Sequence, residues 1–229
     1  MKTVIITGAN GNLGTAVTRF FLDKEYLVIA TVANETMKTE LAVAPQLDVH
    51  VVNLADETTA ANFVAAVVAK YHTIDAALLL VGGFAMGSVA DTSSADIDQQ
   101  VSLNFKTAYH VARPLFQHML AKGQGRLVFI GARPALEPSA GKNLVAYGLS
   151  KSLLFTLADY MNEEAKGKNV TATVVAPSTL DTALNRKSMP DVNPDSWVKP
   201  EALAAILEFI VSDAGAPLRE AVYKVYNNA

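Results

Sequence analysis

The sequence predicts a doubly wound α/β fold, with a seven-stranded, mainly parallel sheet and helices on both faces. Short apolar runs alternate along the chain with longer segments of helical period. The runs are apolar throughout rather than at every second residue, which is typical of parallel strands covered by helices on both sides. No linker or internal repeat divides the chain, so we expect residues 1–229 to form a single domain.

The expected elements follow one another in βαβα order, which winds the sheet through right-handed crossovers. The predicted strands cover residues 3–7, 27–32, 49–54, 76–81, 127–130, 170–176 and 221–225, and the predicted helices about 13–24, 57–71, 97–121, 145–166 and 200–212. The longest stretch without a clear period lies between Pro177 and Pro200. Long loops in compact domains are usually lids or binding loops, so residues 178–199 are predicted to form a substrate lid.

The composition excludes several classes of function. The net charge is −3 and the 19 basic residues are scattered, so a nucleic-acid partner is not expected. With no cysteine, disulfides and thiolate chemistry are excluded, and the four histidines show no ligand spacing that predicts a metal. The apolar run near the N-terminus stops after four residues, too short for an export signal or a membrane span. We expect a cytoplasmic protein with no membrane contact.

Three glycines, Gly8, Gly11 and Gly14, lie between the first predicted strand and the first predicted helix, in "VIITGANGNLGTAV". Glycines there permit a tight turn and close approach of the backbone to a pyrophosphate, which the free N–H groups of the helix then bind. The alternative is a plain strand-to-helix turn, which needs fewer glycines. The motif therefore predicts dinucleotide binding.

The end of the second predicted strand bears on the choice between NAD and NADP. Residues 31–34 read Thr-Val-Ala-Asn, with no carboxylate before Glu35 to bond the ribose diol of NAD and no arginine for the 2′-phosphate of NADP. The missing carboxylate slightly favours NADP, with Thr31, Asn34 or Lys38 as contacts of its 2′-phosphate. Either cofactor remains open.

Tyr147 and Lys151 are four residues apart, which places them on the same face of a helix. A tyrosine is a poor acid or base near neutrality because its ordinary pKa is about 10. A nearby ammonium stabilises the phenolate and brings that pKa closer to a useful range. Taken alone the pair fits an exposed helix face, but together with the glycine loop it predicts proton transfer.

These features together resemble the short-chain dehydrogenase/reductases. The resemblance rests on the glycine loop after Thr7, Asn104 in "VSLNFKTAYH", the Tyr147–Lys151 pair, and Pro177 with Thr182, and it covers essentially the whole chain. It implies a Rossmann-like fold and NAD(P)-dependent oxidoreductase activity on a small-molecule substrate. Tyr147 would exchange a proton with that substrate, Lys151 would lower the tyrosine pKa and hold the nicotinamide ribose, and Asn104 would anchor a water relay. The implied cofactor contacts are Gly8, Asn10, Gly11, Leu13, Gly14, Val32, Asn34, Asn53, Leu54, Gly82, Tyr147, Lys151, Pro177 and Thr182.

The sequence departs from that family where a substrate-binding serine is usual, since Ala132 follows "FIG". The lid "STLDTALNRKSMPDVNPDSW" and the segments "VGGFAMG" and "GARPAL" resemble those of the quinoid dihydropteridine reductases, which also lack the serine. This implies a small planar polarised acceptor of the quinonoid dihydropteridine type, or else a carbonyl or quinone. The expected substrate contacts are Ala132, Arg133, Phe84, Arg186, Met189 and Trp197. Two of them stay open: Arg133 faces either the cleft or solvent, and Arg186 is either a substrate contact or a solvated charge.

The helices predicted at 97–121 and 145–166 are long and fairly apolar, so each must bury a second face. In the resembling family these helices form the subunit contact, which implies a homodimer or homotetramer. An alternative function is a non-catalytic dinucleotide-binding redox sensor or interaction protein. The missing serine favours that alternative, whereas Tyr147, Lys151 and Asn104 favour an enzyme.

Overall fold

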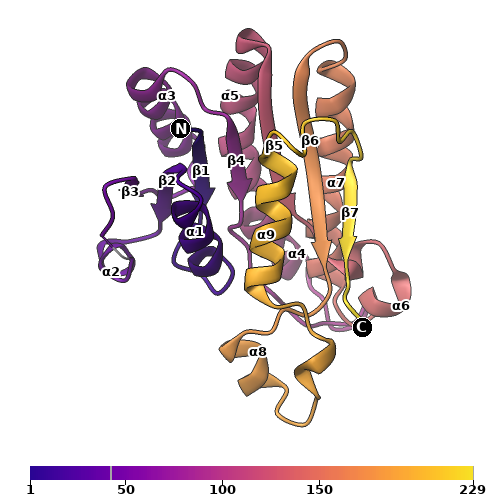
Figure 1. Ribbon diagram of the computed structural model, residues 1–229. Coiled ribbons are helices and arrows are strands. Elements are labelled where there is room, and N and C mark those ends of the chain that lie inside the picture. Colours follow the sequence, from indigo (N-terminus) through magenta and orange to yellow (C-terminus); the bar gives the residue numbers. More distant parts are fainter. Residues whose placement is uncertain (42, 229) are drawn as a thin grey trace.

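The computed structural model describes residues 1–41 and 43–228. Its sheet has the strand order β3-β2-β1-β4-β5-β6-β7, and every described strand pair is parallel (Figure 1). The strands are β1 (Thr3–Thr7), β2 (Leu27–Val32), β3 (Leu47–Val51), β4 (Ala76–Leu79), β5 (Gln124–Ile130), β6 (Asn169–Pro177) and β7 (Val222–Val225). The predicted doubly wound, seven-stranded sheet is confirmed.

Helices flank the sheet on both sides. They are α1 (Gly14–Asp23), α2 (Glu35–Thr39), α3 (Glu57–Tyr71), α4 (Ser94–Val101), α5 (Thr107–Lys122), α6 (Pro138–Gly141), α7 (Val145–Glu164), α8 (Ala183–Ser188) and α9 (Pro200–Val211). A π-helical turn, η1 (Ser102–Lys106), joins α4 to α5, and two short 3-10 helices are η2 (Arg133–Ala135) and η3 (Pro194–Ser196).

The continuous apolar strands contribute side chains to two hydrophobic cores, one on each face of the sheet. Side chains alternate across a strand, so Ile5 packs with α3, α5 and α7, while its neighbours Val4 and Ile6 pack with α1 and α9. Figure 1 shows α1 and α9 together in front of the sheet and α3, α5 and α7 behind it. Both faces of the inner strands β1, β2, β4, β5 and β6 are therefore buried, which explains why they lack an alternating pattern. The edge strands β3 and β7 are partly exposed.

The strand order places the functional segments at one edge of the sheet. After β3, at one side of the sheet, the chain crosses back to form β4 next to β1. The loops after β1 and β4 therefore lead to opposite faces of the sheet. Ligands of open parallel sheets bind in the crevice outside the carboxyl ends of the strands at such a switch point. The short helix α8 lies beyond this same edge in Figure 1.

Several elements differ from the sequence-based expectation: α2 and α6 were not predicted, β4 ends at Leu79 rather than at residue 81, and β5 begins at Gln124 rather than at residue 127. The third strand ends at Val51 rather than at residue 54, because Asn53 accepts a hydrogen bond from the Ala55 N–H and turns the chain towards α3. The helix expected from residue 97 begins at Ser94, where Ser93 caps it, and its backbone changes to a π turn at η1. The lid is not irregular throughout, since it contains α8 and η3 and its two stems pair at Leu180 and Val198.

None of the helices in the described part of the chain is both long enough and apolar enough to span a membrane.

Candidate active site

The glycine loop has the conformation that its three glycines predict. Gly8 has a φ of +66°, in the left-handed region that favours glycine. A Cβ on Gly14 would lie 2.0 Å from the Gly8 carbonyl oxygen, so no larger residue fits where α1 packs against the loop. The Gly11 N–H donates to the Gly8 carbonyl oxygen at 3.0 Å, which closes the turn. The amino end of α1 thus stands directly beside the end of β1.

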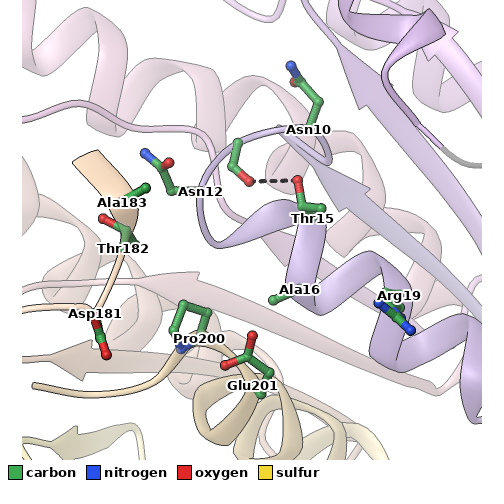
Figure 2. Close-up of a pocket in the computed structure, with 11 residues that line it drawn as sticks. Asn10, Asn12, Thr15, Ala16, Arg19, Asp181, Thr182, Ala183, Pro200 and Glu201 are labelled. Atoms are coloured by element: carbon green, nitrogen blue, oxygen red, sulfur yellow. Dashed lines mark hydrogen bonds between the residues drawn. The ribbon is translucent and has the colours of Figure 1, made fainter. Parts of the chain in front are cut away.

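A pocket of about 420 Å³ opens between this loop and the lid. It brings Asn10 and Gly11 of the loop together with Thr182 of the lid, three of the expected cofactor contacts. Figure 2 shows the loop and the first turns of α1 on one side and residues from Asp181 to Ala183 on the other. The other residues that line the pocket are Asn12, Thr15, Ala16, Arg19, Pro200 and Glu201.

The remaining expected cofactor contacts lie at the carboxyl edge of the sheet in different states of burial. Leu13, Val32, Leu54 and Pro177 are buried, and only their backbone groups or part of their side chains can face a ligand. Three polar side chains are engaged locally: Asn34 accepts from the Met37 N–H as the cap of α2, Thr182 accepts from the Asn185 N–H as the cap of α8, and Asn53 bonds Ala55.

Lys151 is buried in α7 and reaches the end of β5, where its Nζ donates to the Ile130 carbonyl oxygen at 2.8 Å. Burial lowers the pKa of Lys151 to about 8, because an ammonium loses hydration inside the protein. Burial also raises the pKa of Tyr147, one turn earlier, to about 12. Near neutral pH Tyr147 is a protonated phenol, and the lowering of its pKa expected from Lys151 is not seen, because burial dominates and the Lys151 ammonium bonds the Ile130 carbonyl oxygen.

Asn104 is fully buried and lies in the π turn between α4 and α5. Its Oδ1 accepts from the Gly83 N–H at 2.8 Å, and its Nδ2 lies 3.0 Å from the Ser150 Oγ and 2.9 Å from the Gln100 Oε1. Ser150 in turn donates to the Tyr147 carbonyl oxygen at 2.8 Å. The network ties the loop after β4 to the helix that carries Tyr147.

Gly82 lies between the two buried groups. A Cβ at Gly82 would be 2.7 Å from the Asn104 Oδ1 and 3.0 Å from the Lys151 Nζ. The absence of a side chain at Gly82 therefore lets Asn104 and Lys151 approach the same point from two helices. Gly82, Asn104 and Lys151, each named as a site residue from the sequence, lie close together in the structure.

The position of the missing serine is occupied by Ala132, which is buried and carries no hydroxyl. Beside it, the Arg133 Nε donates to the Glu137 Oε2 at 2.6 Å, and its guanidinium lies 5.0 Å over the Tyr226 ring. Arg133 is thus neither free in solvent nor extended into an open cleft, because it is held by Glu137 and Tyr226. The exposed ring of Phe84 lies against the ring of Tyr147.

Two lid side chains named as substrate contacts are held by the lid itself. Arg186 forms a double hydrogen bond with the Asp181 carboxylate, in which Nη2 lies 2.9 Å from Oδ2. Trp197 is buried at the base of the lid, and its carbonyl oxygen accepts from the Asn227 side chain at 3.2 Å. Met189 follows α8 and is half-buried.

Comparison with known proteins decides the family. The family model of short chain dehydrogenases matches residues 2–193, well over half of the chain. The chain belongs to the short-chain dehydrogenase family. This short-chain dehydrogenase is accordingly an NAD(P)-dependent oxidoreductase.

Its curated relatives are similar at moderate identity over nearly the full length. It is 24% identical over 225 residues to the 3-oxoacyl-(acyl-carrier-protein) reductase FabG of Thermotoga maritima, covering 93% of this chain and 91% of the relative. It is 25% identical over 229 residues to the dihydropteridine reductase of Dictyostelium discoideum, covering 97% of this chain and 94% of the relative. Among solved structures, ElxO with NADP bound has a TM-score of 0.89 at 19% identity, with 98% of this chain and 96% of that chain covered. The structural likeness supports the fold.

Two residues of the buried network in this short-chain dehydrogenase escaped the sequence reasoning. Gln100 and Ser150 both bond Asn104, yet neither was named as a site residue. Gln100 lies four residues before Asn104, and Ser150 lies next to Lys151. Helical spacing of four was the signal for Gln100, because such residues share a helix face.

In the described part of this short-chain dehydrogenase no group of three or more His, Asp or Glu side chains is arranged to hold a metal ion.

Proposed function

We propose that this short-chain dehydrogenase transfers a hydride from NAD(P)H to a small planar polarised acceptor of the quinonoid dihydropteridine type. One observation carries the proposal: a buried alanine, Ala132, replaces the usual hydroxyl beside an intact Tyr147, Lys151 and Asn104 constellation. The proposal treats residues 1–229 as one domain with its substrate lid at residues 178–199.

The missing hydroxyl matters because it removes one donor from the acceptor oxygen. Losing an oxyanion donor costs a carbonyl reduction about 3 kcal/mol of barrier. A conjugated, electron-poor acceptor spreads the incoming charge over its ring and gains a proton at a heteroatom, so it depends less on a donor at Ala132. The similarity to the Dictyostelium dihydropteridine reductase supports this acceptor class, and the similarity to FabG supports a carbonyl as the second candidate.

The residues of the site divide the work. The glycine loop and the amino end of α1 would hold the pyrophosphate, and Lys151 would hold the nicotinamide ribose. The bound dinucleotide would supply the hydride. Tyr147, or a water that it orients, would supply the proton, since the phenol is protonated near neutral pH. Asn104 would keep a water relay in place behind Lys151.

Flat apolar surface for the acceptor would come from Phe84, which lies beside Tyr147, and from Met189 of the lid. Ala132 and Arg133 would line the opposite wall, with the Arg133 guanidinium anchored by Glu137. Arg186 pairs with Asp181 and Trp197 is buried, so both would stabilise the conformation of the lid rather than contact the acceptor directly.

We also propose that the protein is a homodimer or homotetramer. Leu149, Leu153 and Tyr160 form an exposed row along α7 at helical spacing. The half-buried Phe105 and Tyr109 stack at 5.7 Å between ring centroids on the neighbouring helix. A face of this kind is suited to a two-fold contact. Light scattering at micromolar concentration tests it, and a monomer would contradict it.

The test of the function is a cofactor oxidation assay with NADH and NADPH separately. The acceptors are quinonoid dihydropterin, two quinones and a panel of small ketones and 3-oxoacyl thioesters. The proposal predicts the highest kcat/KM for quinonoid dihydropterin. A clear preference for a ketone or thioester would contradict this acceptor class and indicate a carbonyl reductase. Tight dinucleotide binding without oxidation by any acceptor would contradict catalysis.

A further inference from the structure

A carboxylate lies against the glycine loop from an unexpected direction. The Asn10 Nδ2 donates to the Glu40 Oε2 at 3.1 Å, although Glu40 comes 30 residues later, directly after α2. The same loop adjoins the end of β2, because the Ala9 N–H donates to the Thr31 carbonyl oxygen at 3.1 Å. Glu40 therefore stands where the glycine loop and the end of β2 meet.

This location bears on which dinucleotide binds. In doubly wound folds the adenosine ribose lies between the glycine loop and the end of the second strand. A carboxylate there accepts hydrogen bonds from the 2′- and 3′-hydroxyl groups of NAD and repels the 2′-phosphate of NADP. In most such folds the carboxylate belongs to the end of the strand itself.

The end of β2 does not supply a selecting group in this protein. Thr31 and Val32 are buried in the sheet, with 1% and 2% of their surfaces exposed. Asn34 uses its side-chain oxygen to cap α2, where it accepts from the Met37 N–H at 2.9 Å. Residues 31–34 therefore offer neither a carboxylate for the diol nor a cation for the phosphate, and no described hydrogen bond joins Glu35, the first carboxylate after the strand, to the glycine loop.

Lys38 is the nearest basic residue in sequence, but the helical backbone turns it away. Glu40 keeps a helical conformation, with φ of −77° and ψ of −19°. Residues two apart in an α-helix project roughly 200° apart around its axis. Since Glu40 faces the glycine loop, Lys38 points to another side, and the charge presented to the ribose is negative.

We propose that Glu40 is the specificity-determining residue for the dinucleotide and that it selects NADH over NADPH. The inference rests on the proposed function, because it assumes a dinucleotide in the glycine-loop site. It reverses the slight lean to NADP that the end of β2 alone suggests. Asn10 acts as the positioning residue, since its amide holds the Glu40 carboxylate against the loop.

The experiment measures the dissociation constants of NADH and NADPH by cofactor fluorescence, and kcat/KM for each with one acceptor. We expect the wild-type protein to prefer NADH by roughly ten- to a hundredfold, the range of a lost diol contact plus repulsion of a phosphate near the surface. Glu40→Gln should shift the NADH/NADPH ratio towards NADPH by about tenfold or more. The wild-type preference should shrink as ionic strength rises, because Glu40 is exposed.

The matched control is Glu25→Gln, which removes the same charge from an exposed residue before the opposite, amino end of β2. We expect it to leave the ratio within about twofold, because an exposed charge further from the ligand is screened. An equal shift in both variants would overturn the role of Glu40, as would a wild-type preference for NADPH or a ratio that Glu40→Gln does not move. Those outcomes leave the proposed function intact, whereas failure to bind either dinucleotide would overturn both.

Discussion

The rings of Phe84 and Tyr147 meet edge to face, with 5.3 Å between their centroids. Phe84 belongs to the loop after β4 and is 63% exposed, which is unusual for a large apolar side chain beside a buried network. The loop is fixed in place because the Gly87 N–H donates to the Asn143 carbonyl oxygen at 2.8 Å and Gly87 accepts from the Val145 N–H at 3.0 Å. An aromatic surface is thus held next to the phenol of Tyr147.

Phe84→Ala should raise KM for the acceptor about three- to tenfold, which is the value of one aromatic contact. KM for the dinucleotide should stay within about twofold, since Phe84 is not among the expected cofactor contacts. Steady-state kinetics with both substrates varied provide the measurement. Val89→Ala, an exposed position in the same loop, is the control, and equal effects of the two substitutions would contradict a specific role for Phe84.

Gly82→Ala should lower kcat/KM by about tenfold or more, because the added methyl meets the Asn104 amide and the Lys151 ammonium rather than open space. Gly83→Ala is the neighbouring control. A Cβ there would meet only the side chain of Leu103, which can move aside. The ratio of the two variants, each checked for folding by circular dichroism, is the decisive quantity. A similar loss of kcat/KM in both variants would argue against a specific contact of Gly82 with Asn104 and Lys151.

Burial of Lys151 should appear in the pH dependence of stability. Its pKa is lowered from 10.5 to about 8, so between these two pH values the unfolded chain binds more protons than the folded protein. The contribution of Lys151 to the free energy of unfolding therefore rises with pH across this window. Lys151→Met should be roughly 1–3 kcal/mol more stable than the wild type at pH 7, and the difference should close towards pH 10.5.

Urea unfolding of both proteins at pH 7, 8.5 and 10 measures that difference. A gap that stays constant with pH would contradict the lowered pKa.

His110 provides a prediction for the adenine end of the dinucleotide site. It is buried in α5, and its Nδ1 lies 2.9 Å from the Leu54 carbonyl oxygen, in the turn between β3 and α3. Loss of this hydrogen bond in His110→Phe should raise the dissociation constant of the dinucleotide by roughly fivefold or more, with kcat little changed. His110→Asn, which keeps a donor, should restore part of the affinity.

AMP and nicotinamide mononucleotide separate the two ends of the site. Competition by AMP should weaken in His110→Phe, and binding of nicotinamide mononucleotide should not. His118→Phe, on the same helix, serves as the control. A loss shared equally by both ligands would mean that His110 acts on the whole fold instead of on the turn at Leu54.

Local spacing made much of this site predictable. Residues close together in sequence predict a local backbone geometry, and the structure has that geometry for the three glycines, the Tyr147–Lys151 pair and the continuous apolar strands. The third strand was placed too late because Val52 and Leu54 extend its apolar run, and both are buried after the strand has ended.

Contacts between distant segments could not be predicted in the same way. Glu40 meets Asn10 because α2, a five-residue helix with no buried residue and thus no apolar stripe, turns the chain back to the glycine loop. Arg133 meets Glu137 at helical spacing, but its contact with Tyr226 joins segments that follow β5 and β7. Such contacts depend on the order of the strands in the sheet, and the local sequence pattern does not specify which distant residues that order brings together.

Tyr147 is proposed to supply the proton that accompanies hydride transfer. Single-turnover oxidation of bound NADH or NADPH by quinonoid dihydropterin, followed by stopped-flow absorbance, measures that step directly. Tyr147→Phe should slow it by about 10² to 10⁴ while the dissociation constant of the dinucleotide changes less than about threefold. Tyr71→Phe, which removes the same hydroxyl at the end of α3, before the amino end of β4, should leave it unchanged. A Tyr147→Phe protein that turns over at the wild-type rate would contradict the claim.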